Sequence, residues 1–221
     1  MTSTDCPPLA ERITKSLLGY GVLAGPFYVI VAAAQAVLRD GYDPTRHSVS
    51  QLANGDFGWI QVVNFVATGA MTIAAAVGIG RALPTGRAAR WATVLLCGYG
   101  AGLVAAAGLR ADPSDGFPPG TPRGVGPMSR HGTGHLLVAG LGFACLIAAG
   151  FVVGAALRQL NAVGWAWFSR ITATVFAAAF LALASGMGGR AAVIAFTVAV
   201  VWVWAWLAAI SVMLYPRVGS T

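Results

Sequence analysis

Residues 110–135, RADPSDGFPPGTPRGVGPMSRHGTGH, form the longest polar break in a chain that is otherwise mostly apolar. The stretch contains Asp112 and Asp115, two of the seven acidic residues, and His131 and His135, two of the three histidines. The third histidine lies in the only other rich polar loop. Because long apolar runs lie on both sides of each loop, the pattern predicts a membrane protein whose polar groups gather in two loops.

The composition supports that class of protein. The 221 residues are 57% hydrophobic and only 10% charged, whereas a soluble domain carries about 25% charged residues. The net charge is +7, but the basic residues are scattered singly, which excludes a nucleic-acid binder because such proteins cluster them on one face. The three cysteines form neither a disulfide framework nor a CxxC metal motif.

Six apolar runs are long enough to cross a bilayer, which takes about 20 residues per helix. The predicted helices cover residues 17–38, 59–82, 91–109, 134–157, 165–185 and 191–214. Residues 1–16 and 215–221 are predicted to be cytoplasmic tails, with the first 14 residues disordered. We therefore expect an all-α bundle of six transmembrane helices over residues 17–214.

Basic residues give a weak indication of orientation. With both termini in the cytoplasm, eight of the fourteen Lys and Arg residues fall on the inner side and six on the outer side. This excess favours an N-in/C-in arrangement, in which both polar loops are extracytoplasmic. We expect an integral protein of the plasma membrane, which is the inner membrane in a bacterium.

Pairs of glycines four residues apart predict where helices approach closely. Gly98 and Gly102 form one pair, and Gly150 and Gly154 form another. Small residues at this spacing lie on one face of a helix and let a neighbouring backbone come near. Both pairs are therefore predicted to lie at helix–helix contacts.

The two histidines of the long polar stretch have the spacing of a metal-binding pair. His131 and His135 are four residues apart, which places both rings on one face of a helix capped by Ser129. With Asp112 they could hold a divalent metal such as zinc, which would activate water. The glutamate of HExxH is absent. Hydrogen bonding to loop carbonyls and proton transfer are the alternatives.

The first polar loop also contains candidate reactive groups. Asp43 and Arg46 could form an ion pair, or Arg46 could bind an anionic lipid head group. Ser48 could act as a nucleophile with His47 or His131 as its base. The alternative is a short capped helix over residues 48–53.

A polar stripe runs along the second predicted helix. Gln61, Asn64, Thr68 and Thr72 recur at spacings of three and four, so they share one face that must point into the bundle. The stripe either makes hydrogen bonds between helices or lines a polar cavity below the loops. The candidate substrate-binding residues are Asp43, Arg46, Gln61, Asn64 and Arg130.

Three motifs together resemble a known family. They are GYDPTRHSVSQLANGDFGWIQVVNF at residues 41–65, RADPSDG at residues 110–116 and HGTGH at residues 131–135. The chain resembles the membrane-protein family named domain of unknown function 998 over nearly its whole length. The resemblance implies about six helices and carries no established activity.

Three classes of function remain open. The first is a membrane-embedded enzyme that acts on a lipid or isoprenoid-like substrate, by metal-assisted hydrolysis or acid-catalysed rearrangement. Its candidate catalytic residues are His47, Ser48, Asp112, His131 and His135. The second is a transporter or binding protein for lipids or small molecules, acting alone or as a homo-oligomer. The third is an assembly partner of another membrane protein.

Overall fold

The apolar runs fold into six long helices, which confirms the predicted all-α architecture. The structure is a computed structural model that describes residues 7–124 and 126–219. All six helices are long and apolar enough to span a membrane, and the described residues contain no β-strand. The helices are α1 (Leu9–Leu38), α2 (Gly58–Ala82), α3 (Arg87–Gly108), α4 (Arg130–Gln159), α5 (Val163–Ala184) and α6 (Gly189–Leu214), with short 3-10 helices η1 (Val49–Ala53) and η2 (Tyr215–Arg217).

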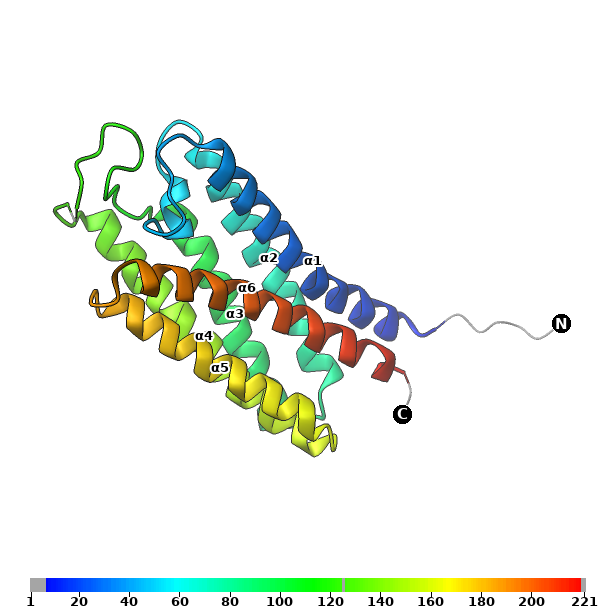
Figure 1. Ribbon diagram of the computed structural model, residues 1–221. Coiled ribbons are helices and arrows are strands. Elements are labelled where there is room, and N and C mark those ends of the chain that lie inside the picture. The colour runs from blue at the N-terminus through cyan, green and yellow to red at the C-terminus, as the bar shows by residue number, and fades with distance from the viewer. Residues whose placement is uncertain (1–6, 125, 220–221) are drawn as a thin grey trace.

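The six helices form a closed ring. Each helix packs against the next one along the chain, and α6 returns to pack against α1. Residues 39–57, 109–124 and 126–129 and the turn at 185–188 lie at one end, which we name the loop end. The described termini and the turns at 83–86 and 160–162 lie at the opposite end, which we name the terminal end (Figure 1). The two polar loops therefore share one side of the bundle, as predicted.

Several helices begin earlier than hydropathy predicts. α1 starts at Leu9 rather than residue 17, so the prediction of a disordered segment is wrong for residues 9–14; residues 1–6 lie outside the described part. Thr14 accepts a hydrogen bond from Nε of Arg81 at 2.9 Å, and Nζ of Lys15 lies 5.6 Å from the centre of the Tyr215 ring. Polar contacts of this kind extend a helix beyond its apolar run, which is the only part that hydropathy detects.

The glycine pairs lie at helix–helix contacts, as predicted. A Cβ atom at Gly102 would lie 3.0 Å from the Cα atom of Gly142. One at Gly150 would lie 2.8 Å from the Cβ atom of Ala173. Gly98 and Gly154 make similarly close approaches to α4 and α5. The helices can be this close because these residues have no side chain.

The two ends of the ring differ in how fully they are packed. Near the terminal end, large side chains such as Leu18, Ile79, Leu157 and Leu214 are completely buried. In the middle, the Trp204 ring lies 5.2 Å from that of Tyr28 and 5.8 Å from that of Tyr99. The loop half, in contrast, contains a cavity.

Candidate functional site

The two polar loops bind each other and form one structure over the loop end, the loop cap (residues 39–57, 109–124 and 126–129). Its main contact is a bidentate ion pair between Arg46 and Asp115. Nε of Arg46 lies 2.8 Å from Oδ2 of Asp115, and Nη2 lies 2.6 Å from Oδ1. Nε2 of Gln51 donates to Oγ of Ser114 at 2.6 Å. Residues nearly 70 positions apart in sequence are thereby held together.

A small apolar core stabilises the loop cap. Phe117 is 0% exposed and packs with Ala32 and Leu52. Its ring meets that of Tyr42 edge-on at 5.3 Å. The guanidinium of Arg39 lies 5.0 Å from the Phe117 ring and donates to the carbonyl of Leu52 at 2.6 Å. Because an aromatic ring is buried inside it, the loop cap is a packed structure with its own apolar core.

His47 has a structural place in this cap. Nδ1 accepts a hydrogen bond from the backbone N–H of Asp43 at 2.9 Å, and Nε2 donates to the carbonyl of Asp115 at 3.1 Å. An amide only donates and a carbonyl only accepts, so these partners fix the tautomer. Both ring nitrogens are occupied, and His47 is not among the residues that line the cavity.

The acids of the cap have depressed pKa values because of their hydrogen bonds. The Arg46 guanidinium, followed by the N–H of Gly124, lowers the pKa of Asp115 to about 2. The hydroxyl and N–H of Thr45 lower the pKa of Asp43. The predicted pairing of Asp43 with Arg46 is wrong, because Arg46 pairs with Asp115 and Asp43 binds Thr45.

Asp112 caps α4. Ser129 is the N-cap residue, as predicted, and its Oγ accepts from the N–H of Gly132 at 3.0 Å. The Asp112 carboxylate accepts from the N–H of Ser129 at 2.8 Å and from its hydroxyl at 2.5 Å. These bonds lower the pKa of Asp112. A Cβ atom at Gly132 would overlap the Asp112 carboxylate, so a larger residue there would have to displace that side chain.

The two remaining histidines have different surroundings. His131 is exposed at the start of α4, whereas His135 is 5% exposed and lines the cavity. Nδ1 of His135 donates to the carbonyl of Leu109 at 2.7 Å. The described residues contain no group of three His, Cys, Asp or Glu side chains that could hold a metal ion. The structure therefore does not assemble His131, His135 and Asp112 into a metal site.

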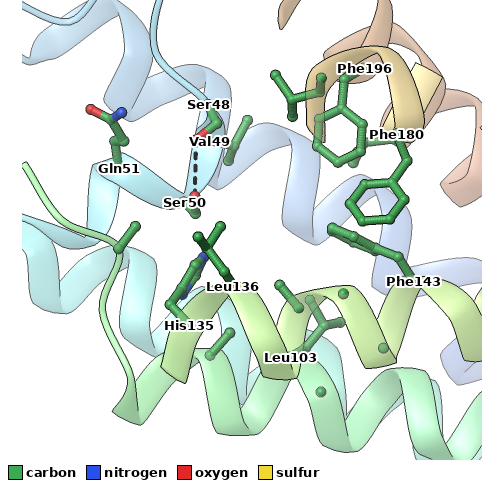
Figure 2. A pocket seen from close by; sticks show the side chains of 18 of the residues that line it. Ser48, Val49, Ser50, Gln51, Leu103, His135, Leu136, Phe143, Phe180 and Phe196 are labelled. Atoms are coloured by element: carbon green, nitrogen blue, oxygen red, sulfur yellow. Dashed lines mark hydrogen bonds between the residues drawn. The ribbon is translucent and has the colours of Figure 1, made fainter. Parts of the chain in front are cut away.

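The cavity lies below the loop cap and has a volume of about 550 Å³. Polar side chains line it next to the cap: Ser48, Ser50, Gln51, Asp112, Ser114 and His135. Apolar side chains line its deeper part, including Leu103, Phe143, Phe180, Phe196 and Val200. Figure 2 shows Ser48, Ser50 and His135 on one side of this space and the three phenylalanines on the other. The cavity therefore has a polar end and an apolar end.

The polar stripe of α2 belongs to the contact with α1. Nε2 of Gln35 on α1 donates to Oε1 of Gln61 at 2.9 Å, and Nδ2 of Asn64 donates to the carbonyl of Tyr28 at 3.2 Å. Thr68 in turn donates to Oδ1 of Asn64 at 3.2 Å. The stripe therefore makes hydrogen bonds between helices. Neither Gln61 nor Asn64 is among the described lining residues of the cavity.

Three other predicted binding residues also lie away from the cavity. Arg46 and Asp43 are in the loop cap, and Arg130 is an exposed residue at the first position of α4. None of them is among the described lining residues. Of the predicted site residues, the structure places Ser48, Asp112 and His135 at the cavity.

Sequence reasoning missed the aromatic part of the site. Phe143, Phe180 and Phe196 lie in apolar helices, where phenylalanine is ordinarily a core or lipid-facing residue. The Phe143 ring meets Phe180 at 5.2 Å and Phe196 at 5.4 Å. No local pattern identifies such a cluster, because it depends on how three helices are placed relative to one another.

Six helices of membrane-spanning length around a capped cavity define the class as an integral membrane protein with an internal cavity. The chain belongs to the DUF998 family: the model described as "Protein of unknown function (DUF998)" matches residues 22–213, which confirms the resemblance. No curated protein and no solved structure matches the chain. The family description carries no activity, so function must be argued from the cavity.

Proposed function

We propose that the protein binds a lipid or isoprenoid-like amphiphile in the cavity. The observation that carries this proposal is the gradient of polarity, with hydroxyls, an amide, a carboxylate and an imidazole near the cap and aromatic side chains deeper in the bundle. A ligand matched to this gradient has a polar head at the cap and an apolar chain between α3, α4, α5 and α6. Binding sites of this kind combine an apolar lining with a few placed polar groups.

The volume supports a ligand with a single chain. A group the size of a water molecule occupies roughly 30 Å³, so a cavity of about 550 Å³ holds about 18 such groups. This number accommodates one chain with a small head.

The edge of the cavity supports access from the membrane. Leu136, in the second turn of α4, lines the cavity and is 58% exposed. Met128 also lines it and is 63% exposed, and so does Ala184, the last residue of α5, which is exposed. An apolar chain can therefore enter beside α4 without disrupting the loop cap. The packed terminal half favours a binding pocket over an open channel.

Filling the cavity tests the proposal. A Cβ atom at Gly140, which lines the cavity, would meet no atom within 4 Å, so Gly140→Leu has room to fill the space. Gly19 on α1 is equally unobstructed and is not among the described lining residues, which makes Gly19→Leu the matched control.

We expect native mass spectrometry of the purified protein to detect a retained single-chain lipid in the wild type and in Gly19→Leu. The Gly140→Leu variant should lose it while remaining folded. Equal retention by all three proteins would show that the lipid binds elsewhere and would remove the proposal.

Catalysis on the bound amphiphile is the second candidate function. It is favoured by the presence of His135 and the hydrogen-bonded pair Ser48 and Ser50, 3.0 Å apart, in the lining of the cavity. Because Nδ1 of His135 donates to a carbonyl, Nε2 carries the lone pair of the neutral ring and can accept a proton. His47 is held inside the loop cap and is not among the described lining residues.

Turnover distinguishes the two candidates. Under the catalytic candidate, wild-type protein converts its retained lipid on incubation, and both His135→Gln and Ser50→Ala slow that conversion by about a hundredfold or more. If the lipid is recovered unchanged from the wild type, the catalytic candidate is excluded, and lipid binding or transport across the membrane is the function. Tracer flux in proteoliposomes then separates a transporter from a binding protein.

A further inference from the structure

The charge of the cavity lining is negative. Among the described residues that line it, Asp112 is the only acid, and there is no Lys or Arg. Hydrogen bonds from Ser129 lower the pKa of Asp112, so its carboxylate is charged at neutral pH. The other polar groups near the cap are hydroxyls, an amide and the His135 imidazole.

Two of the four arginines of the loop cap, Arg39 and Arg46, are bound to other groups, and Arg110 and Arg123 are exposed residues outside the described lining of the cavity. Arg46 is held by both carboxylate oxygens of Asp115. Arg39 donates to the carbonyls of Leu52 and Asn54 at 2.6 and 2.5 Å and lies over the Phe117 ring. Neither guanidinium belongs to the described lining of the cavity. The loop cap therefore presents no cation to a head group inside the cavity.

This distribution of charge opposes an anionic ligand. A phosphate or carboxylate head beside Asp112 would place two like charges next to each other at the edge of the cavity, where they repel. It would also lose its hydration without gaining a cationic partner.

A hydroxyl-bearing head has matching partners. The hydroxyls of Ser48 and Ser50 can each donate and accept. The Asp112 carboxylate and Nε2 of His135 are acceptors for a donated hydroxyl hydrogen. All four residues line the cavity, so an alcohol can exchange its bonds to water for bonds to the protein.

Resting on the lipid-binding function proposed above, we propose that the cavity selects a single-chain lipid with an uncharged, hydroxyl-bearing head group and rejects anionic head groups. Monoacylglycerols and long-chain alcohols have this chemistry. Fatty acids and lysophospholipids with a net negative charge do not.

Three probes with the same acyl chain test the selectivity: a monoacylglycerol, the free fatty acid and the corresponding lysophosphatidylglycerol. Affinity is measured on the purified full-length protein at neutral pH and low ionic strength, by titration followed with native mass spectrometry. We expect the monoacylglycerol to bind about tenfold more tightly than either anionic probe, because of the Asp112 charge. Binding of the monoacylglycerol should be lost in Gly140→Leu and kept in Gly19→Leu.

Introducing a cation into the cavity tests the cause. Ser50→Lys places a positive charge among the lining residues, and Ser185→Lys places one at an exposed position in the turn between α5 and α6, outside the described lining. We expect Ser50→Lys to reduce the preference for the monoacylglycerol to about threefold or less, or to reverse it. Ser185→Lys should leave it unchanged.

The outcomes separate this inference from the proposed function. If an anionic probe binds wild-type protein as tightly as the monoacylglycerol, in a manner lost in Gly140→Leu, the selectivity is overturned while lipid binding stands. If Ser50→Lys and Ser185→Lys change the preference equally, the charge of the cavity is not its cause and the inference is overturned. If no probe binds in a manner sensitive to Gly140→Leu, both proposals fail.

Discussion

Asp115 connects the two polar loops through both its side chain and its backbone. Its carboxylate holds Arg46, and its carbonyl accepts from His47. Asp115 has a positive φ of 52°, a conformation that Asp adopts more readily than most residues. Asp115 precedes Gly116, and an Asp-Gly pair by itself indicates only a turn. In the structure, this turn residue is the centre of the contact between the loops.

The depressed pKa of Asp115 predicts acid sensitivity of the loop cap. Its pKa falls from 3.8 to about 2 in the folded protein, so the stabilising contribution is complete above about pH 4 and is lost as the pH falls through 2. We expect Asp115→Asn to lower the unfolding temperature in detergent at pH 5, and the gap from wild type to close as the pH approaches 2. The change Asp40→Asn in the other polar loop, residues 39–57, serves as control. A gap that stays constant from pH 5 to pH 2 would contradict the assigned role.

Phe117 provides a second residue-scale prediction. Its ring is completely buried among Ala32, Leu52 and Tyr42, and truncating a buried phenylalanine to alanine costs about 3–5 kcal/mol. We expect Phe117→Ala to destabilise the loop cap by about this amount and Phe117→Leu by less. Limited proteolysis of residues 110–124 measures the opening of the cap. Unchanged protease resistance in Phe117→Ala would show that the ring does not hold the cap together.

At the scale of elements, the start of α4 explains why Asp112 resembles a catalytic residue in the sequence. It lies at the edge of an apolar run and needs a partner. That partner is the N-cap residue Ser129. Loss of an N-cap interaction costs about 1 kcal/mol, so we expect Asp112→Ala to destabilise the protein by about this amount in chemical unfolding. Asp112→Asn keeps an acceptor and should lose less. Equal losses would show that the charge, rather than the hydrogen bonding, is what α4 requires.

The contact between α2 and α3 depends on two facing glycines. A Cβ atom at Gly69 would lie 2.6 Å from the carbonyl oxygen of Gly100, and one at Gly100 would lie 2.8 Å from that of Gly69. Because both obstacles are backbone atoms, Gly69→Ala should force the helices apart and destabilise the protein by about 1–3 kcal/mol. Gly108→Ala, at the unobstructed end of α3, is the control, and thermal unfolding in detergent measures both. A Gly69→Ala variant as stable as Gly108→Ala would show that the contact is not close.

At the scale of the whole molecule, the sequence predicts the helices well and the site poorly. Apolar length alone defines six spans, and polar breaks define the two loops. The ring arrangement and the cavity depend on distances between helices that are remote in sequence, which no local pattern encodes. Residue type therefore does not distinguish His135, which lines the cavity as Ser48 does, from His47, which is bound inside the loop cap.

The ring of helices also sets the depth of the cavity. Its apolar end is closed by Phe143, whose ring meets Phe176 at 5.3 Å and Phe196 at 5.4 Å. Phe176 also borders a small void of about 10 Å³ shared with Trp206, so a shorter side chain at Phe143 would extend the cavity toward the terminal half. Under the lipid-binding proposal, Phe143 therefore limits the chain length of the ligand.

We expect Phe143→Leu to shift the retained or preferred lipid to chains longer by about two to four carbons, at roughly 0.8 kcal/mol for each additional methylene that becomes buried. Phe151→Leu, on the same helix but 43% exposed and outside the described lining, should leave the preference unchanged. Competition between monoacylglycerols of increasing chain length, followed by native mass spectrometry, measures the shift. If Phe143→Leu and Phe151→Leu select the same chain lengths as wild type, the aromatic cluster does not form the end of the binding space, and the chain must lie in another direction.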